Sequence, residues 1–363
     1  MRSWHAGMLP CDRPPRKTSG AILLFVDAIS AHLDRGWDLI EKGDLVGAEK
    51  SARRILKLDK KAPEAYLLLG AAASARGDLE GAAAQYERAM EIDPDYVDPM
   101  LAAAEIYAFE LDDPARAIAL CEQALEAAAG DRAVEVDALL TRAEAELCAG
   151  QEAAARRSFG ALGAGPLGEA ATELRAGQLA IDLGDFATAA ERLARTTGAP
   201  EVAADGWHAL GLLAEERGDL RRMAECWLRT RELDRAASRP PWVVSEARFE
   251  EIAAEALAEL PERIRQLLAN VPILACDVPS KEIVAEGNDP RMMGFFSGVP
   301  WPEKSTLGGG APHLDCIFLY QHNIERQSRT AAEMAEEIRT TLFHETGHFF
   351  GLDEDELDDL GLG

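Results

Sequence analysis

The chain has 363 residues, of which 47% are hydrophobic, and its formal net charge is −26. This length favours two domains, because single cores seldom grow far beyond about 250 residues, and the apolar content suffices for a buried core. The strong negative charge disfavours nucleic acid and anionic membranes as partners, because like charges repel one another.

The N-terminal region shows no membrane-span or signal-peptide pattern. Its apolar run, residues 21–26, ends at Asp27 and is shorter than either pattern requires. The six cysteines are scattered without a CxxC pair, which indicates free thiols in a reducing compartment. We therefore expect a cytoplasmic protein, with residues 1–27 disordered because their start contains Pro10, Pro14 and Pro15.

From residue 28 to residue 238 one pattern recurs about six times. In its clearest copy, residues 63–96, small and apolar residues recur at helical spacing on both sides of a Gly77-Asp78 break. The fourth and fifth copies are less regular, because charged or polar residues occupy some packing positions. The pattern resembles the tetratricopeptide repeat (TPR), which implies an all-α solenoid of antiparallel helix pairs. The other copies of the Gly-Asp pair are Gly43-Asp44, Gly184-Asp185 and Gly218-Asp219.

The resemblance to TPR proteins also implies a function for this array. Such arrays bind protein or peptide segments in a concave groove, so we expect a protein partner there and no nucleic acid or membrane. A generic alanine-rich bundle is the alternative, but the fixed period of the Gly-Asp pairs disfavours it. The pattern does not identify the partner or predict the oligomeric state.

The pattern changes at residues 239–242, where Pro240 and Pro241 remove two backbone donors and end the last repeat helix. Beyond this point, residues 249–260 and 263–268 predict helices, and residues 271–278, 292–296 and 316–320 predict short strands. The overall expectation is an α+β chain, in which a small α/β domain at residues 239–363 follows the all-α array.

A final helix is predicted to begin with a capping box at Thr330 and Glu333 and to end at Gly351. His344 and His348 lie four residues apart on this helix, so their imidazoles share one face and can bind one metal ion. Glu345 lies beside the first of them, where it can take a proton from a metal-bound water. This HExxH pattern is typical of zinc peptidases.

A third metal ligand is expected in the acidic tail that follows. Gly351 turns the chain back, and Glu354 stands where the longer pattern HExxHxxGxxH has its third ligand. A carboxylate there completes a His2Glu set, which is a known catalytic zinc arrangement with one open position. Asp353 and Asp355 flank Glu354 and remain open as alternatives, whereas the rest of the tail is expected to be a solvated surface.

The last third of the chain is similar to the minimal zincin-like metallopeptidase family of bacteria. The similarity rests on residues 294–300 (GFFSGVP), on the strand at residues 317–319 and on residues 344–352 (HETGHFFGL). It implies a small α/β domain with zinc at the end of the active-site helix. The family usually has aspartate at the place of Glu354, so this chain keeps the charge but has a longer side chain.

Together these patterns predict a cytoplasmic zinc-dependent peptidase. In this hypothesis, water activated by zinc and Glu345 attacks a peptide carbonyl, and the TPR array recruits the substrate. The alternative is a TPR adaptor whose zinc domain is structural or catalytically silent, but the intact Glu345 favours the enzyme. His313 and His322 lie near the last strand, where such residues are more often surface or core histidines.

Overall fold

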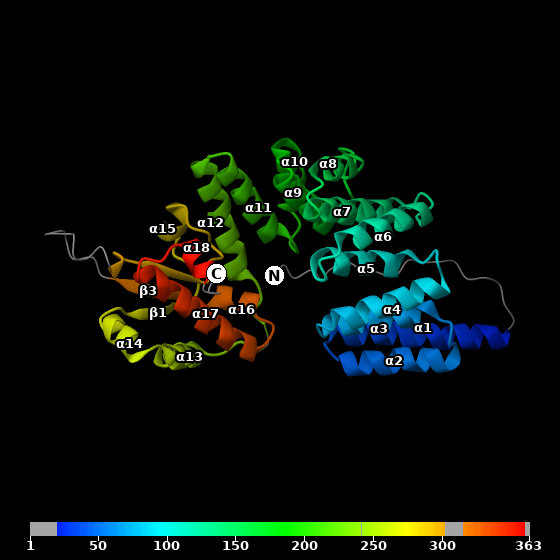
Figure 1. Cartoon of the computed structure of the whole chain (residues 1–363), viewed down its shortest axis with the longest axis horizontal. Helices are drawn as coiled ribbons and strands as arrows, with labels where there is room; N and C mark the ends of the chain where they lie inside the picture. Colours follow the sequence, from blue (N-terminus) through cyan, green and yellow to red (C-terminus); the bar gives the residue numbers. More distant parts are fainter. Residues whose placement is uncertain (1–19, 241, 302–314, 360–363) are drawn as a thin grey trace. The chain divides into compact units, whose positions relative to one another are not determined.

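The computed structural model describes residues 20–240, 242–301 and 315–359 (Figure 1). Of the disorder expected for residues 1–27, the part at residues 1–19 lies outside the described residues, as does His313, whereas residues 20–27 are helical. The chain divides into two compact units, residues 1–196 and 197–363. No helix among the described residues is long and apolar enough to cross a membrane.

The first unit consists of five helix pairs, as the repeat pattern predicts, and the second unit begins with a sixth pair (Figure 1). Residues 30–235 contain no strand, so the all-α expectation for this region is confirmed. The first helix begins before residue 28, where the array was expected to start. The helices are α1 (Gly20–Glu41), α2 (Leu45–Leu58), α3 (Pro63–Ala75), α4 (Leu79–Ile92), α5 (Val97–Phe109), α6 (Pro114–Ala127), α7 (Arg132–Cys148), α8 (Glu152–Gly160), α9 (Ala170–Asp182), α10 (Phe186–Thr196), α11 (Ala203–Glu216) and α12 (Leu220–Ala236).

The Gly-Asp pairs form the turn inside each regular repeat. Gly77 has a φ of +85°, a left-handed conformation that favours glycine after a helix. Asp78 then caps α4, because its side chain accepts a hydrogen bond from the backbone N–H of Gly81 at 3.0 Å. The other three pairs repeat this arrangement, which explains why both residues recur at one phase of the repeat.

Small residues on the first helix of a pair let a large side chain of the second approach closely. A Cβ on Gly70 would lie 2.3 Å from the ring of Tyr86, and one on Gly211 would lie 2.0 Å from the indole of Trp227. Tyr86 and Trp227 are both buried, so they are packing residues of the repeats. Any larger residue at either glycine would force these rings out of place.

The irregular fourth and fifth repeats contain buried ion pairs in addition to their apolar contacts. Glu173 is buried and accepts from Arg192 at 3.1 Å and from Arg195 at 3.2 Å. Arg175 donates to Glu144 at 3.0 Å and also bonds the hydroxyl of Thr141. Charged residues at these packing positions are thus paired, which offsets the cost of burying them.

In the second unit, three strands form one small sheet, and the three predicted strands are confirmed with shorter bounds for the first two. The order is β1-β3-β2, with β1 parallel and β2 antiparallel to the central strand. Ile317 and Leu319 of β3 are fully buried in the core that also contains Ile338 and Leu342. The strands are β1 (Ile273–Cys276), β2 (Gly294–Ser297) and β3 (Cys316–Tyr320).

Six further helices surround this sheet (Figure 1). The first two and the long penultimate helix match the prediction, whereas the other three short helices have no counterpart in it. The expected α+β fold class is confirmed. The helices are α13 (Glu246–Glu259), α14 (Glu262–Leu268), α15 (Lys281–Ala285), α16 (Gln321–Gln327), α17 (Ala331–Phe349) and α18 (Glu354–Asp359).

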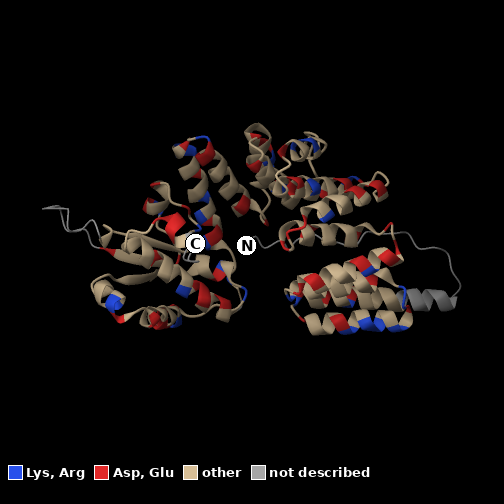
Figure 2. Cartoon of the chain, in the orientation of Figure 1, with Lys and Arg blue, Asp and Glu red and all other residues tan. Residues whose placement is uncertain are grey.

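Acidic side chains occur on helices throughout both units, and α2 carries several basic ones (Figure 2). The four basic residues of α2 are all exposed, in a chain whose net charge is −26. The residues are Lys50, Arg53, Arg54 and Lys57.

Candidate metal centre

The two histidines of the HExxH pattern lie together near the end of α17. The helix begins as predicted, because the hydroxyl of Thr330 accepts from the backbone N–H of Glu333 at 3.1 Å. One turn separates His344 from His348, and their Nε2 atoms are 3.0 Å apart. Both side chains are about three-quarters buried, so the helix directs both toward one point.

Glu354 joins the two histidines from the far side of the turn. Gly351 has a φ of +83° and ends the helix region, after which α18 begins at Glu354. The carboxylate oxygens of Glu354 lie 3.6 Å from His344 Nε2 and 3.4 Å from His348 Nε2. The structure therefore brings all three predicted ligands together.

The flanking aspartates have other surroundings. Asp353 caps α18, because its carboxylate accepts from the backbone N–H of Glu356 at 3.0 Å, and Glu356 accepts from the N–H of Asp353. Asp355 is outside the group of side chains that could hold a metal ion. Of the three candidate carboxylates, Glu354 is the one that faces the histidines.

The three side chains fit a zinc ion in number, type and spacing. Ligand atoms bound tetrahedrally at about 2.0–2.1 Å would lie about 3.3 Å from one another. The two Nε2 atoms are 3.0 Å apart, and each lies 3.4–3.6 Å from a different carboxylate oxygen of Glu354, so the three side chains lie close enough together to share one ion. In addition, the Nδ1 atom of His348 lies 3.1 Å from the carbonyl oxygen of Leu352, which holds the ring with Nε2 toward the other two ligands.

Two residues that the sequence analysis did not single out bring Glu354 to this place. A Cβ on Gly347 would lie 2.3 Å from the side chain of Leu357, which is fully buried. The short α18 therefore docks directly on the backbone of α17. Leu357 is the one apolar residue between Asp353 and Asp359, and this isolated position in an acidic run was the available signal.

Glu345 lies against strand β2 and is not one of the three grouped side chains. Its side chain is 6% exposed, and its carboxylate accepts a hydrogen bond from the backbone N–H of Phe296. Burial raises the pKa of the Glu345 carboxyl, and the neighbouring His344 and His348 only partly oppose this. A buried carboxyl with a raised pKa is a stronger proton acceptor than one in water, as a general base requires.

Gly294 in β2 gives Glu345 its space. A Cβ at this glycine would lie 2.7 Å from the Glu345 side chain and 2.7 Å from the Thr341 methyl group. We expect Gly294→Ala to destabilise the second unit by about 1–3 kcal/mol, because neither neighbour can move without disturbing α17. Gly198→Ala is the matched control, since nothing lies within 4 Å of its added Cβ. Equal urea midpoints for the two variants would contradict this account.

Of the two histidines noted near the last strand, His322 falls within the described residues and lies apart from the metal-binding group. His322 is the second residue of α16, is 7% exposed, and is not one of the three side chains brought together above. Burial lowers the pKa of its imidazole below the ordinary 6.5, assisted by the charge of Arg239. This buried environment agrees with the interpretation of His322 as a core histidine without a role in the site.

This depressed pKa predicts a pH dependence of stability. The unfolded chain binds the proton more readily than the folded chain, so the stability that His322 contributes is present above pH 6.5 and is lost as pH falls through the lower folded pKa. We expect His322→Gln to reduce the loss of thermal stability on acidification below 6.5. Thermal melts of both proteins across this range would test it, and parallel pH profiles would contradict it.

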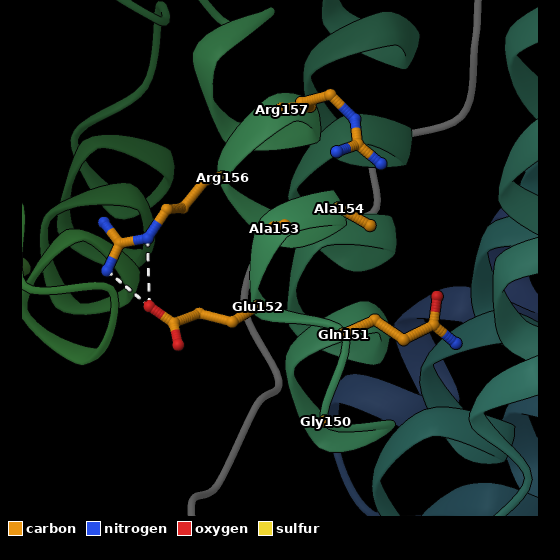
Figure 3. A pocket seen from close by; sticks show the side chains of 7 residues that line it. All are labelled: Gly150, Gln151, Glu152, Ala153, Ala154, Arg156 and Arg157. Atoms are coloured by element: carbon orange, nitrogen blue, oxygen red, sulfur yellow. Dashed lines mark hydrogen bonds and ion pairs between the residues drawn. The ribbon is translucent and has the colours of Figure 1, made fainter.

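A separate hollow lies in the first unit, at the turn between α7 and α8 (Figure 3). Glu152 is its single carboxylate, and Arg156 donates to it at 3.0 Å. No histidine or cysteine lines this hollow, so it lacks the groups that would bind a transition metal. The lining residues are Gly150, Gln151, Glu152, Ala153, Ala154, Arg156 and Arg157.

Comparison with known families assigns both parts of the chain. Residues 268–363 match the model of a zincin-like metallopeptidase, and residues 33–97 and 174–222 match a tetratricopeptide repeat. The first of these matches contains the whole group of candidate ligands. The comparison with curated proteins gave no match.

Several solved structures are similar to the helical part. Pseudomonas aeruginosa PilF is 16% identical, with a TM-score of 0.46, and the match covers 64% of this chain and 99% of that one. PilW, a type IV pilus biogenesis factor, is 18% identical with a TM-score of 0.48, over 58% and 95% of the two chains. A thermophilic TPR protein in Thermus thermophilus is 18% identical with a TM-score of 0.41, over 50% and 98%.

Proposed function

Because this chain carries tetratricopeptide repeats followed by a zincin-like metallopeptidase domain, we propose that it is a zinc-dependent hydrolase acting on protein or peptide substrates. The observation that carries the proposal is the meeting of His344, His348 and Glu354, with Glu345 next to them in the helix and outside the group of ligands. A closed structural zinc site needs four protein ligands and no base, whereas three ligands leave a position open.

His344, His348 and Glu354 would hold the metal in this proposal. A zinc ion in such a site polarises a carbonyl group and lowers the pKa of bound water. Glu345 would take the proton of the attacking water on its carboxylate and later release it to the leaving amine. The N–H of Phe296 would orient the carboxylate during both transfers, because it already hydrogen-bonds that group.

The repeats supply the second half of the proposal. TPR proteins bind protein segments, so we propose that the array recruits or orients the substrate of the metallopeptidase domain. The five described cysteines are free thiols, as expected in a reducing compartment, and we retain the cytoplasm as the proposed location.

Two measurements on the purified full-length chain test this function. Elemental analysis should find about one zinc per chain, as expected for a single three-ligand site. A mixture of peptides of varied sequence should be cleaved, and cleavage should stop when a chelator removes the metal and return when zinc is restored. A protein that holds zinc and cleaves neither peptides nor unfolded proteins would support the adaptor instead.

A further inference from the structure

The last repeat pair, α11–α12, packs against the C-terminal elements within the second unit. Val284 of α15 is fully buried in a cluster with Ala214, Met223 and Trp227 of these two helices. Gly287 follows with a φ of +100°, and a Cβ there would lie 3.1 Å from the Met223 side chain. The chain is thus held close to α12 just before it enters strand β2.

Four charges continue this contact. Asp234 of α12, whose side chain is 7% exposed, accepts from Arg291 Nε at 2.7 Å and from Arg326 at 2.7 Å. Asp205 of α11 accepts from the same two arginines, at 2.8 and 2.9 Å. Two carboxylates from the repeat therefore share two guanidinium groups from the metallopeptidase domain. We call these residues the four-charge network.

A histidine–carboxylate contact also joins α11 to Asp289, two residues before Arg291. His208 Nε2 of α11 lies 2.9 Å from an oxygen of Asp289, and Asp289 also accepts from the backbone N–H of Arg291 at 2.7 Å. On the opposite side, the Asn323 amide donates to the carbonyl oxygens of Pro290 and Met292, at 2.8 and 2.7 Å. Segment 289–293 is therefore fixed from both sides.

Segment 289–293 leads straight into the residues that contact Glu345. The carbonyl oxygen of Met293 accepts from the N–H of Tyr320, which begins the pairing of β2 with β3. Gly294 then lies against the Glu345 side chain, and the N–H of Phe296 bonds its carboxylate. A displacement of segment 289–293 would move both contacts, whereas His344 and His348 are carried by α17 itself.

We propose that the last repeat pair is a positioning element of the hydrolase site: through the four-charge network, Asp234 and Arg291 hold segment 289–293 and thereby keep β2 against Glu345. The part of this proposal that concerns catalysis rests on the proposed function, while the part that concerns β2 does not. The terminal repeat is then part of the catalytic apparatus as well as the end of a recruiting array.

The test replaces Asp234 by asparagine in the full-length chain and measures three quantities. Removing this buried carboxylate leaves the two arginines with Asp205 alone as their counter-charge in the network, so hydrogen exchange of residues 294–297 should accelerate by about tenfold or more. Exchange in α13 and the zinc affinity should stay near wild type. If the wild type cleaves peptide, kcat should fall by about tenfold with little change in KM.

Two further variants make the result decisive. Glu225→Gln removes an exposed carboxylate of the same helix, paired with Arg221 and Arg222, and should change none of these quantities. Arg291→Gln should reproduce the effect of Asp234→Asn, and Arg291→Lys should recover part of it. Arg291→Gln also replaces Asp234→Asn as the test if the latter fails to fold.

Unchanged hydrogen exchange at residues 294–297 would overturn the proposal. Equal acceleration of exchange in β2 and α13 would also overturn it, because the network would then only stabilise the unit as a whole. Absence of peptide cleavage by the wild type would count against the hydrolase function alone, because the exchange measurement needs no turnover.

Discussion

Replacement of Glu345 by glutamine should leave zinc bound and the fold intact but abolish hydrolysis. Glutamine keeps the size of the side chain and can still accept from the Phe296 N–H, yet it loses the charge that binds a proton. The carboxylate of Glu345 is not in the group of three ligand side chains, so metal content should not change. Loss of a general base typically lowers the rate by about 10²–10⁴-fold.

The measurement pairs zinc content with the rate of peptide cleavage for the variant and the wild type. Glu336→Gln is a matched control, because this glutamate lies on the same helix and forms only an exposed ion pair with Arg339. Retained cleavage in Glu345→Gln would remove the proposed base from the mechanism, and loss of zinc would show that Glu345 is itself a ligand.

The helical part of the fold was predictable because its signals are local and repeated. Gly77 and Asp78 act within one turn, through a left-handed backbone conformation and a helix cap, and the same two residues recur three more times. Likewise, His344 and His348 meet because of the helical period alone. Such features need no knowledge of distant parts of the chain.

The surroundings of the candidate site depend on contacts that local patterns do not encode. Gly294 lies 51 positions before Glu345 in the numbering, and the two come together through tertiary structure, which includes the pairing of β2 with β3. Leu357 docks α18 on Gly347, but a lone leucine in an acidic run gives a weak signal. The ion pairs of Asp234 join segments 57 or more residues apart, so the position of the last repeat was not predictable from periodicity.

The compact division at residues 196 and 197 illustrates the same point. The sequence pattern predicts a boundary near residue 239, where two prolines end the last repeat helix. The sixth helix pair nevertheless clusters with the metallopeptidase elements, through Val284 and the four-charge network. The repeat pattern predicts the local fold of a segment, whereas the division into compact units depends on the tertiary contacts that the folded segment makes.

Replacement of His344 or His348 by alanine should empty the metal site. Each change removes one of three ligands. Mutating a residue that only hydrogen-bonds a ligand typically lowers metal affinity by about 10- to 100-fold, so removing a ligand itself should lower zinc affinity by about 100-fold or more. Neither side chain belongs to the apolar core of the domain, so both variants should fold. Elemental analysis of the purified variants, with circular dichroism to verify folding, gives the result.

Glu354→Ala extends this experiment to the residue whose identity was least determined by the sequence. Its carboxylate lies within 3.6 Å of both imidazoles although the side chain is 72% exposed, so we expect the same loss of zinc without a loss of stability. Asp355→Ala removes an equal charge one residue away and should keep the metal. If Asp355→Ala loses zinc while Glu354→Ala retains it, the third ligand is misassigned. If the alanine variants of His344, His348, Glu354 and Asp355 all retain zinc, the chain does not bind zinc through this motif, and the role proposed for Glu345 is wrong.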